Sequence, residues 1–87
     1  MDQDLKTKIR QLLAKHGQLP LAIDSIGNTD DLYAAGLKSF AVVQVMLALE
    51  GAFDIEFPDK MLVRRTFSSL GHIEQSVAEL VDGKAGA

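Results

Sequence analysis

The fold is decided by one apolar stretch of the chain, Ser39-Phe40-Ala41-Val42-Val43-Gln44-Val45-Met46-Leu47-Ala48-Leu49-Glu50. Its apolar residues recur at helical spacing over a length that exceeds an ordinary strand. Serine is a favoured N-cap residue, so we expect a helix from Ser39 to Ala52 with Ser39 as its cap. Because the apolar band is wide, this helix is either largely buried or keeps an exposed apolar face for a partner.

Two amphipathic helices are expected on either side of this stretch. The first runs from about Asp4 to His16 and stops at Gly17, with aliphatic residues at helical spacing and lysines between them. The last runs from about Ser68 to Val81, and the glycine-rich residues 83–87 are expected to form a frayed tail. No alternating β-branched run survives inspection, so the fold class is all-α.

The connections between these helices differ in length. Residues from Gln18 to Leu37 contain Pro20, Gly27 and the turn-forming run Asn28-Thr29-Asp30-Asp31, yet they are rich in apolar side chains. We therefore expect a long structured loop packed onto the core. A short helical piece over Lys60 to Arg64, capped by Asp59, precedes the last helix. The prediction is a bundle of three main helices and one short helix, forming a single domain over 1–87 with about 4–82 ordered.

Composition and charge exclude several classes of protein. The chain has 87 residues, 47% of them hydrophobic and 24% charged, which suits one globular domain. Its formal net charge of −3 argues against nucleic acid, whose binding needs clustered Lys and Arg. No apolar run is long enough for a membrane span and no signal peptide is evident, so we expect a cytoplasmic protein, monomeric by default. The chain has no cysteine, so any thiol that it uses must be borrowed.

The approach to the central helix and its continuation resemble the acyl carrier protein family. The approach is Asp31-Leu32-Tyr33-Ala34-Ala35-Gly36-Leu37-Lys38-Ser39-Phe40, and the continuation is Leu49-Glu50-Gly51-Ala52-Phe53-Asp54-Ile55-Glu56-Phe57-Pro58-Asp59. The resemblance covers nearly the whole chain. It implies that Ser39 carries 4′-phosphopantetheine, attached covalently from coenzyme A by a phosphopantetheinyl transferase. A phosphodiester there would lie where the helix dipole favours an anion, and the arm would supply the missing thiol.

The surroundings of Ser39 depart from those of fatty-acid carriers. The attachment tripeptide of those carriers is commonly Asp-Ser-Leu, whereas here it is Lys38-Ser39-Phe40, and the central helix has a single acidic residue, Glu50. Electrostatic steering by an acidic helix would therefore be nearly absent, and we expect partners to bind mainly an apolar face. The candidate partner-binding residues are Lys38, Phe40, Val43, Met61, Arg64 and Arg65.

In these features the chain looks more like specialised free-standing bacterial carriers, some of which are charged with an amino acid by a seryl-tRNA-synthetase-like ligase. The resemblance implies an aminoacyl thioester as cargo, a loading ligase and a downstream acyl acceptor enzyme. A carrier of fatty or polyketide acyl chains is an alternative that keeps Ser39 and changes only the cargo. A helical protein-interaction domain without a prosthetic group is another.

Catalysis by the chain itself is the least favoured interpretation. The sequence has no metal cluster, no glycine-rich phosphate loop and no titratable pair at catalytic spacing. Its two histidines, His16 and His72, fall in different predicted helices.

Overall fold

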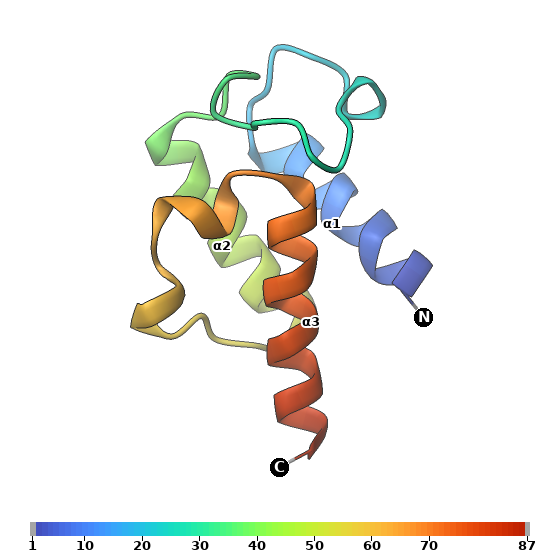
Figure 1. Cartoon of the computed structure of the whole chain (residues 1–87), viewed down its shortest axis with the longest axis vertical. Coiled ribbons are helices and arrows are strands. Elements are labelled where there is room, and N and C mark those ends of the chain that lie inside the picture. The colour runs from blue at the N-terminus through green and yellow to red at the C-terminus, as the bar shows by residue number, and fades with distance from the viewer. Residues whose placement is uncertain (1, 87) are drawn as a thin grey trace.

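The computed structural model describes residues 2–86, with side chains described from 4 to 83. It contains three α-helices, α1 (Asp2–His16), α2 (Ser39–Phe53) and α3 (Leu70–Gly86). Three short 3-10 segments, η1 (Ile23–Ser25), η2 (Asp59–Met61) and η3 (Arg64–Phe67), lie in the connections. In Figure 1 the helices form a bundle, and the α1–α2 loop covers the end of it where α2 begins. Residues 2–86 contain no strand, which confirms the all-α class.

One apolar core joins the three helices. The helical residues that are at most 1% exposed in this core are Ile9, Leu13, Ala41, Val45, Leu49, Leu70, Ile73 and Val77. Full burial of a large aliphatic side chain stabilises a fold by about 1.5–3 kcal/mol, so this cluster is the main force that holds the bundle. No helix within the described part of the chain has the length and apolar content that a membrane crossing requires.

The long loop is packed onto this core, as predicted. Its residues Ile26, Leu32 and Leu37 are at most 4% exposed and join the same cluster. Arg10 of α1 donates hydrogen bonds to the carbonyl oxygens of Ile23 (3.2 Å) and Ile26 (3.0 Å) and to Oδ1 of Asn28 (3.0 Å). The loop is thus fastened by side chains inside the core and by a guanidinium at its edge.

The end of the loop sets the position of α2. Gly36 has φ of +117°, a conformation that glycine adopts readily and other residues do not. A Cβ on Gly36 would lie 2.7 Å from Cδ of Pro20, so the two segments of the loop touch there. The Leu37 N–H donates to the Leu32 carbonyl oxygen at 2.9 Å, and the chain then enters α2.

Helix α2 does not begin as the sequence suggested. Ser39 is its first residue rather than its N-cap, because Lys38 holds the N-cap position with extended backbone (φ −94°, ψ 157°). The predicted piece over Lys60 to Arg64 is replaced by η2 and η3, and Pro58 rather than Asp59 precedes η2. No continuous helix forms over Lys60 to Arg64, because Leu62 (ψ 59°) and Val63 (ψ 157°) depart from helical geometry between η2 and η3.

Helix α3 is also shifted from its predicted limits of Ser68 and Val81. The Ser69 hydroxyl accepts a hydrogen bond from the His72 N–H at 3.1 Å, the geometry of an N-cap, so the helix begins at Leu70. It continues to Gly86, into the expected tail, while Ala87 lies outside the described residues. A single helical glycine such as Gly83 costs about 1 kcal/mol, which is too little to end a helix anchored by its packed turns.

Candidate functional site

Ser39 lies exposed at the junction between the long loop and α2. The helix starts with bonds from the N–H groups of Ala41 and Val42 to the Lys38 carbonyl oxygen, both at 3.0 Å. The earlier N–H groups of a first turn have no intrahelical partner and face an incoming anion. The Ser39 side chain therefore combines accessibility with a favourable place for a phosphate.

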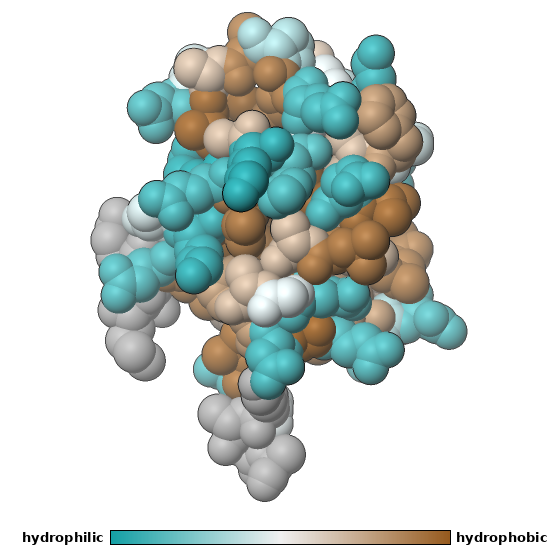
Figure 2. Space-filling view, turned by 180° about the vertical axis from the view of Figure 1, so that it is seen from behind, coloured by the Kyte–Doolittle hydropathy of each residue, from teal (hydrophilic) through white to brown (hydrophobic). Residues whose placement is uncertain are grey.

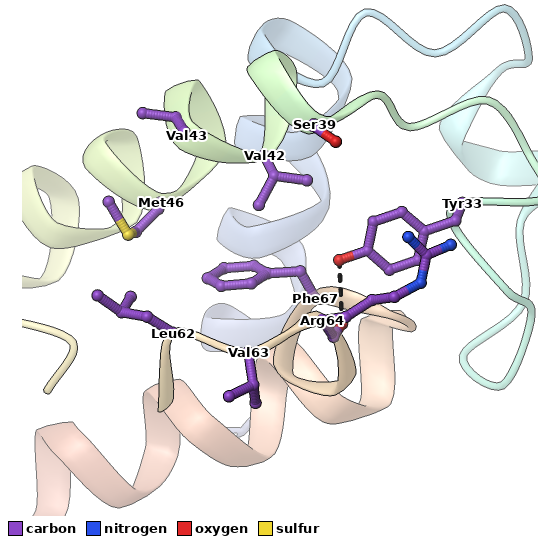
Figure 3. Close-up of a pocket in the computed structure, with 9 residues that line it drawn as sticks. All are labelled: Tyr33, Ser39, Val42, Val43, Met46, Leu62, Val63, Arg64 and Phe67. Atoms are coloured by element: carbon purple, nitrogen blue, oxygen red, sulfur yellow. Dashed lines mark hydrogen bonds between the residues drawn. The ribbon is translucent and has the colours of Figure 1, made fainter. Parts of the chain in front are cut away.

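An open groove with a volume of about 370 Å³ starts at Ser39. One wall is α2, and the other is the segment that joins η2 to η3. In Figure 3, Tyr33 and Arg64 lie at the Ser39 end, whereas Met46 and Leu62 lie at the opposite end. The groove is thus polar beside the serine and apolar away from it.

Tyr33 and Arg64 form a fixed pair beside Ser39. The Tyr33 hydroxyl donates to the Arg64 carbonyl oxygen at 3.0 Å, and the Arg64 guanidinium carbon lies 3.8 Å from the Tyr33 ring centroid. Burial raises the pKa of Tyr33 above its usual 10.0, the charge of Arg64 acts to lower it, and Asp31 acts to raise it. At neutral pH the phenol is therefore protonated, and the pair ties the long loop to η3.

The partner-binding candidates do not all lie together. Lys38 and Phe40 flank Ser39 and are exposed, and Val43 and Arg64 share the groove with Ser39. Met61 is partly buried against the core. It lines a different depression together with Arg65 and His72.

Helix α2 presents an apolar face to the surface. Phe40, Val43 and Leu47, spaced three and four residues apart, are 56%, 49% and 54% exposed. We call these three residues the α2 apolar face. In Figure 2, which shows the molecule from behind, hydrophobic side chains gather on the side where α2 lies. Exposed apolar residues grouped in this way usually mark an interaction site.

Several residues of the site are not among those predicted from the sequence. Tyr33, Leu62 and Val63 line the groove, and the last two are 48% and 51% exposed. The available signal was that Leu62 and Val63 follow Pro58 and precede two arginines, a context of a surface turn. Tyr33 offered no such signal, because its partner lies 31 residues away.

A helical bundle with an exposed serine at the start of its second helix, next to a groove, is the arrangement that a carrier domain needs. Residues 7–81 match the family described as "Phosphopantetheine attachment site". The chain belongs to this family of carrier proteins, which hold covalently attached 4′-phosphopantetheine and are not catalytic themselves.

Relatives narrow the class to homologues of aminoacyl carrier proteins. The chain is 54% identical over 83 residues to the aminoacyl carrier protein of Agrobacterium fabrum (strain C58 / ATCC 33970). This match covers 95% of this chain and 100% of the relative. A carrier protein from Agrobacterium tumefaciens, in a crystal structure with an engineered Bradyrhizobium japonicum glycine:carrier protein ligase and AMP, is 56% identical with a TM-score of 0.82. That match covers 84% of this chain and 97% of the other.

A more distant carrier has the same fold. It is the glycylated carrier protein in a crystal structure of the Bradyrhizobium japonicum glycine:carrier protein ligase, with 26% identity and a TM-score of 0.72. The match covers 84% of this chain and 97% of that one.

Proposed function

We propose that Ser39 is the residue that carries 4′-phosphopantetheine and that the arm holds an aminoacyl group as a thioester. The observation that carries this proposal is the exposed Ser39 side chain, at the first residue of α2 and at the head of the groove. The residues fit the group, because the hydroxyl is accessible and Arg64 offers a positive charge in the same groove. When bound, the group supplies the thiol that this cysteine-free chain lacks.

Glycine is the cargo that we propose to test first. The carrier protein from Agrobacterium tumefaciens was crystallised with a glycine:carrier protein ligase, and the more distant carrier in the comparison is glycylated. A phosphopantetheinyl transferase would install the arm, a ligase of this kind would load it, and a downstream enzyme would accept the acyl group. The open groove suits a small cargo, because an aminoacyl group needs no interior volume.

The proposed docking surface for these enzymes is the α2 apolar face together with Lys38 and Arg64. The face starts one residue after Ser39, so a partner bound to it would have the base of the arm within reach. An apolar centre with a charged rim is the usual composition of a protein interface.

The first experiment measures intact mass. Wild type and Ser39→Ala are each incubated with coenzyme A, Mg²⁺ and a broad-specificity transferase. Wild type should gain the mass of one phosphopantetheine, and Ser39→Ala should gain none. If both gain the group, attachment lies elsewhere. If neither gains it while a control carrier does, the chain is an interaction domain without a prosthetic group.

The second experiment tests cargo and docking. Holo-protein is mixed with ATP, glycine and the Bradyrhizobium japonicum ligase, and in parallel with a fatty acid and an acyl-carrier ligase. Glycyl loading without fatty-acyl loading supports the proposal, and the reverse result supports a carrier of fatty acyl chains.

Phe40→Ala should raise the KM of the ligase for the carrier. Leu21→Ala is the matched control, since Leu21 is 53% exposed in the long loop and not on α2.

A further inference from the structure

We propose that Arg64 is the cation that pairs with the phosphodiester on Ser39, and that Tyr33 holds Arg64 in position for it. This inference rests on the proposed attachment at Ser39. It assigns a role in holding the prosthetic group to two residues outside α2.

The two side chains share one groove. Ser39 and Arg64 both line it, and in Figure 3 the Ser39 hydroxyl and the Arg64 guanidinium lie at the same end. Within the part of the chain whose side chains are described, no carboxylate lies within ion-pair distance of this guanidinium, since the ion pair found there joins Lys6 and Glu74. Among the residues whose side chains are described, Arg64 is therefore a charge without a counter-ion, in the same groove as the hydroxyl that would receive a phosphate.

The guanidinium is also held before any phosphate arrives. The Arg64 guanidinium is stacked on the Tyr33 ring, and the Tyr33 hydroxyl donates a hydrogen bond to the Arg64 carbonyl oxygen. A flexible arginine would lose rotamer freedom on pairing, whereas one already stacked on a ring loses less. Its planar donors suit phosphate oxygens, and the contact would be a charge-assisted hydrogen bond.

The other charges near Ser39 are less suited. Lys38 is adjacent in sequence but exposed at the N-cap, and neither an ion pair nor a ring fixes its ammonium among the described residues. Arg65 lines a different depression. The Asp31 carboxylate accepts bonds from the N–H groups of Tyr33 (2.9 Å) and Ala34 (3.3 Å), so it is tied to the loop. Pairing with Arg64 would direct the base of the arm toward the groove rather than into solvent.

The test uses phosphorus-31 NMR on holo-proteins whose loading is first verified by intact mass. Wild type is compared with Arg64→Gln, Arg65→Gln and Lys38→Gln, which remove the same charge at three places. We expect the phosphodiester resonance to move in Arg64→Gln and to stay near the wild-type position in the other two. In wild type, added salt should move the resonance toward its position in Arg64→Gln, because screening weakens an exposed pair.

A second readout needs no phosphorus signal. The chain has one tyrosine and no tryptophan, so ultraviolet absorbance follows the ionisation of Tyr33 alone. Conversion from apo to holo should raise the pKa of Tyr33 further in wild type, since a phosphate beside the pair opposes the phenolate and neutralises Arg64. This rise should shrink in Arg64→Gln and persist in Arg65→Gln.

The outcomes separate the two proposals. If mass shows loading at Ser39 but the phosphorus resonance is the same in wild type and Arg64→Gln, or moves equally in all three variants, the Arg64 proposal is overturned and Ser39 attachment stands. If Lys38→Gln alone moves the resonance, Lys38 is the partner and the proposal is wrong. If no variant and no wild type is loaded, attachment at Ser39 is wrong and this inference falls with it.

Discussion

Replacing Gly36 by alanine tests whether the end of the long loop sets the position of α2. Gly36 has φ of +117°, and an added Cβ would lie 2.7 Å from Cδ and 3.0 Å from Cγ of Pro20. A residue other than glycine in such a backbone conformation costs about 1–3 kcal/mol. Overpacking against the Pro20 ring costs about 1–3 kcal/mol more. Alanine also restricts the unfolded chain, which returns about 0.4–1 kcal/mol to the folded state.

The expected net loss in the free energy of unfolding is about 1–6 kcal/mol, the sum of these terms. At about 0.05–0.15 kcal/mol per residue, a chain of this length has a total of only about 4–13 kcal/mol. Since 1 kcal/mol moves Tm by about 4–8 °C in a domain of this size, Gly36→Ala should melt at least about 4 °C below wild type. Thermal unfolding followed by circular dichroism measures this directly.

Gly51→Ala is the matched control, with the opposite expected sign. Gly51 is exposed in α2, and an added Cβ there meets nothing within 4 Å. Alanine is favoured over glycine inside a helix by about 0.5–1 kcal/mol, so Tm should rise by about 2–8 °C. A Gly36→Ala protein that melts at or above wild type would refute the contact with Pro20 and the strained turn before α2.

Leu49→Ala should lower the free energy of unfolding by about 2–5 kcal/mol in urea titrations, while Leu47→Ala, on the exposed side of the same helix, should lower it by less than about 1 kcal/mol. Equal losses would mean that α2 packs differently. Arg10→Met removes three hydrogen bonds that fasten the loop and should cost about 2–3 kcal/mol; an unchanged urea midpoint would show that the core side chains alone hold the loop. Because the pKa of Tyr33 is raised in the folded state, the folded protein binds the phenol proton more tightly than the unfolded chain does. The contribution of Tyr33 to stability is therefore fully present below pH 10.0 and is lost as pH rises through the folded pKa. Tyr33→Phe should lack that part of the alkaline loss in urea titrations repeated across pH, and an identical alkaline profile would contradict it.

The sequence was sufficient to predict the bundle, because α1 and α3 each have one clear apolar face. The residues on both sides of Ser39 were also sufficient to propose it as the attachment site, and this assignment stays a prediction. The sequence could not tell which face of α2 enters the core. Ala41, Val45 and Leu49 are buried, whereas Phe40, Val43 and Leu47 are exposed, and both sets are apolar at helical spacing.

The boundaries and the groove were harder to predict for a different reason. The starts of α2 and α3 depend on backbone conformation at Lys38 and on one Ser69 hydroxyl, and several neighbouring residues could have served either role. The pair of Tyr33 and Arg64 joins segments that meet only when the whole chain is folded. Local pattern carries no information about such a contact, and family resemblance drew attention to residues around the serine instead.

Glu50, the single acidic residue of α2, makes a hydrogen bond within the molecule. Oε2 of Glu50 accepts a hydrogen bond from the Phe57 N–H at 2.9 Å, where it holds the turn after the helix. A partner that meets the surface of α2 would therefore recognise it by shape and apolar contact, with little attraction from acidic side chains over a distance. In a cell that contains several carriers of this fold, enzymes that bind a negatively charged helix would bind this carrier weakly. The lack of an acidic helix would therefore contribute to the choice of partners, together with the contacts that the α2 apolar face makes.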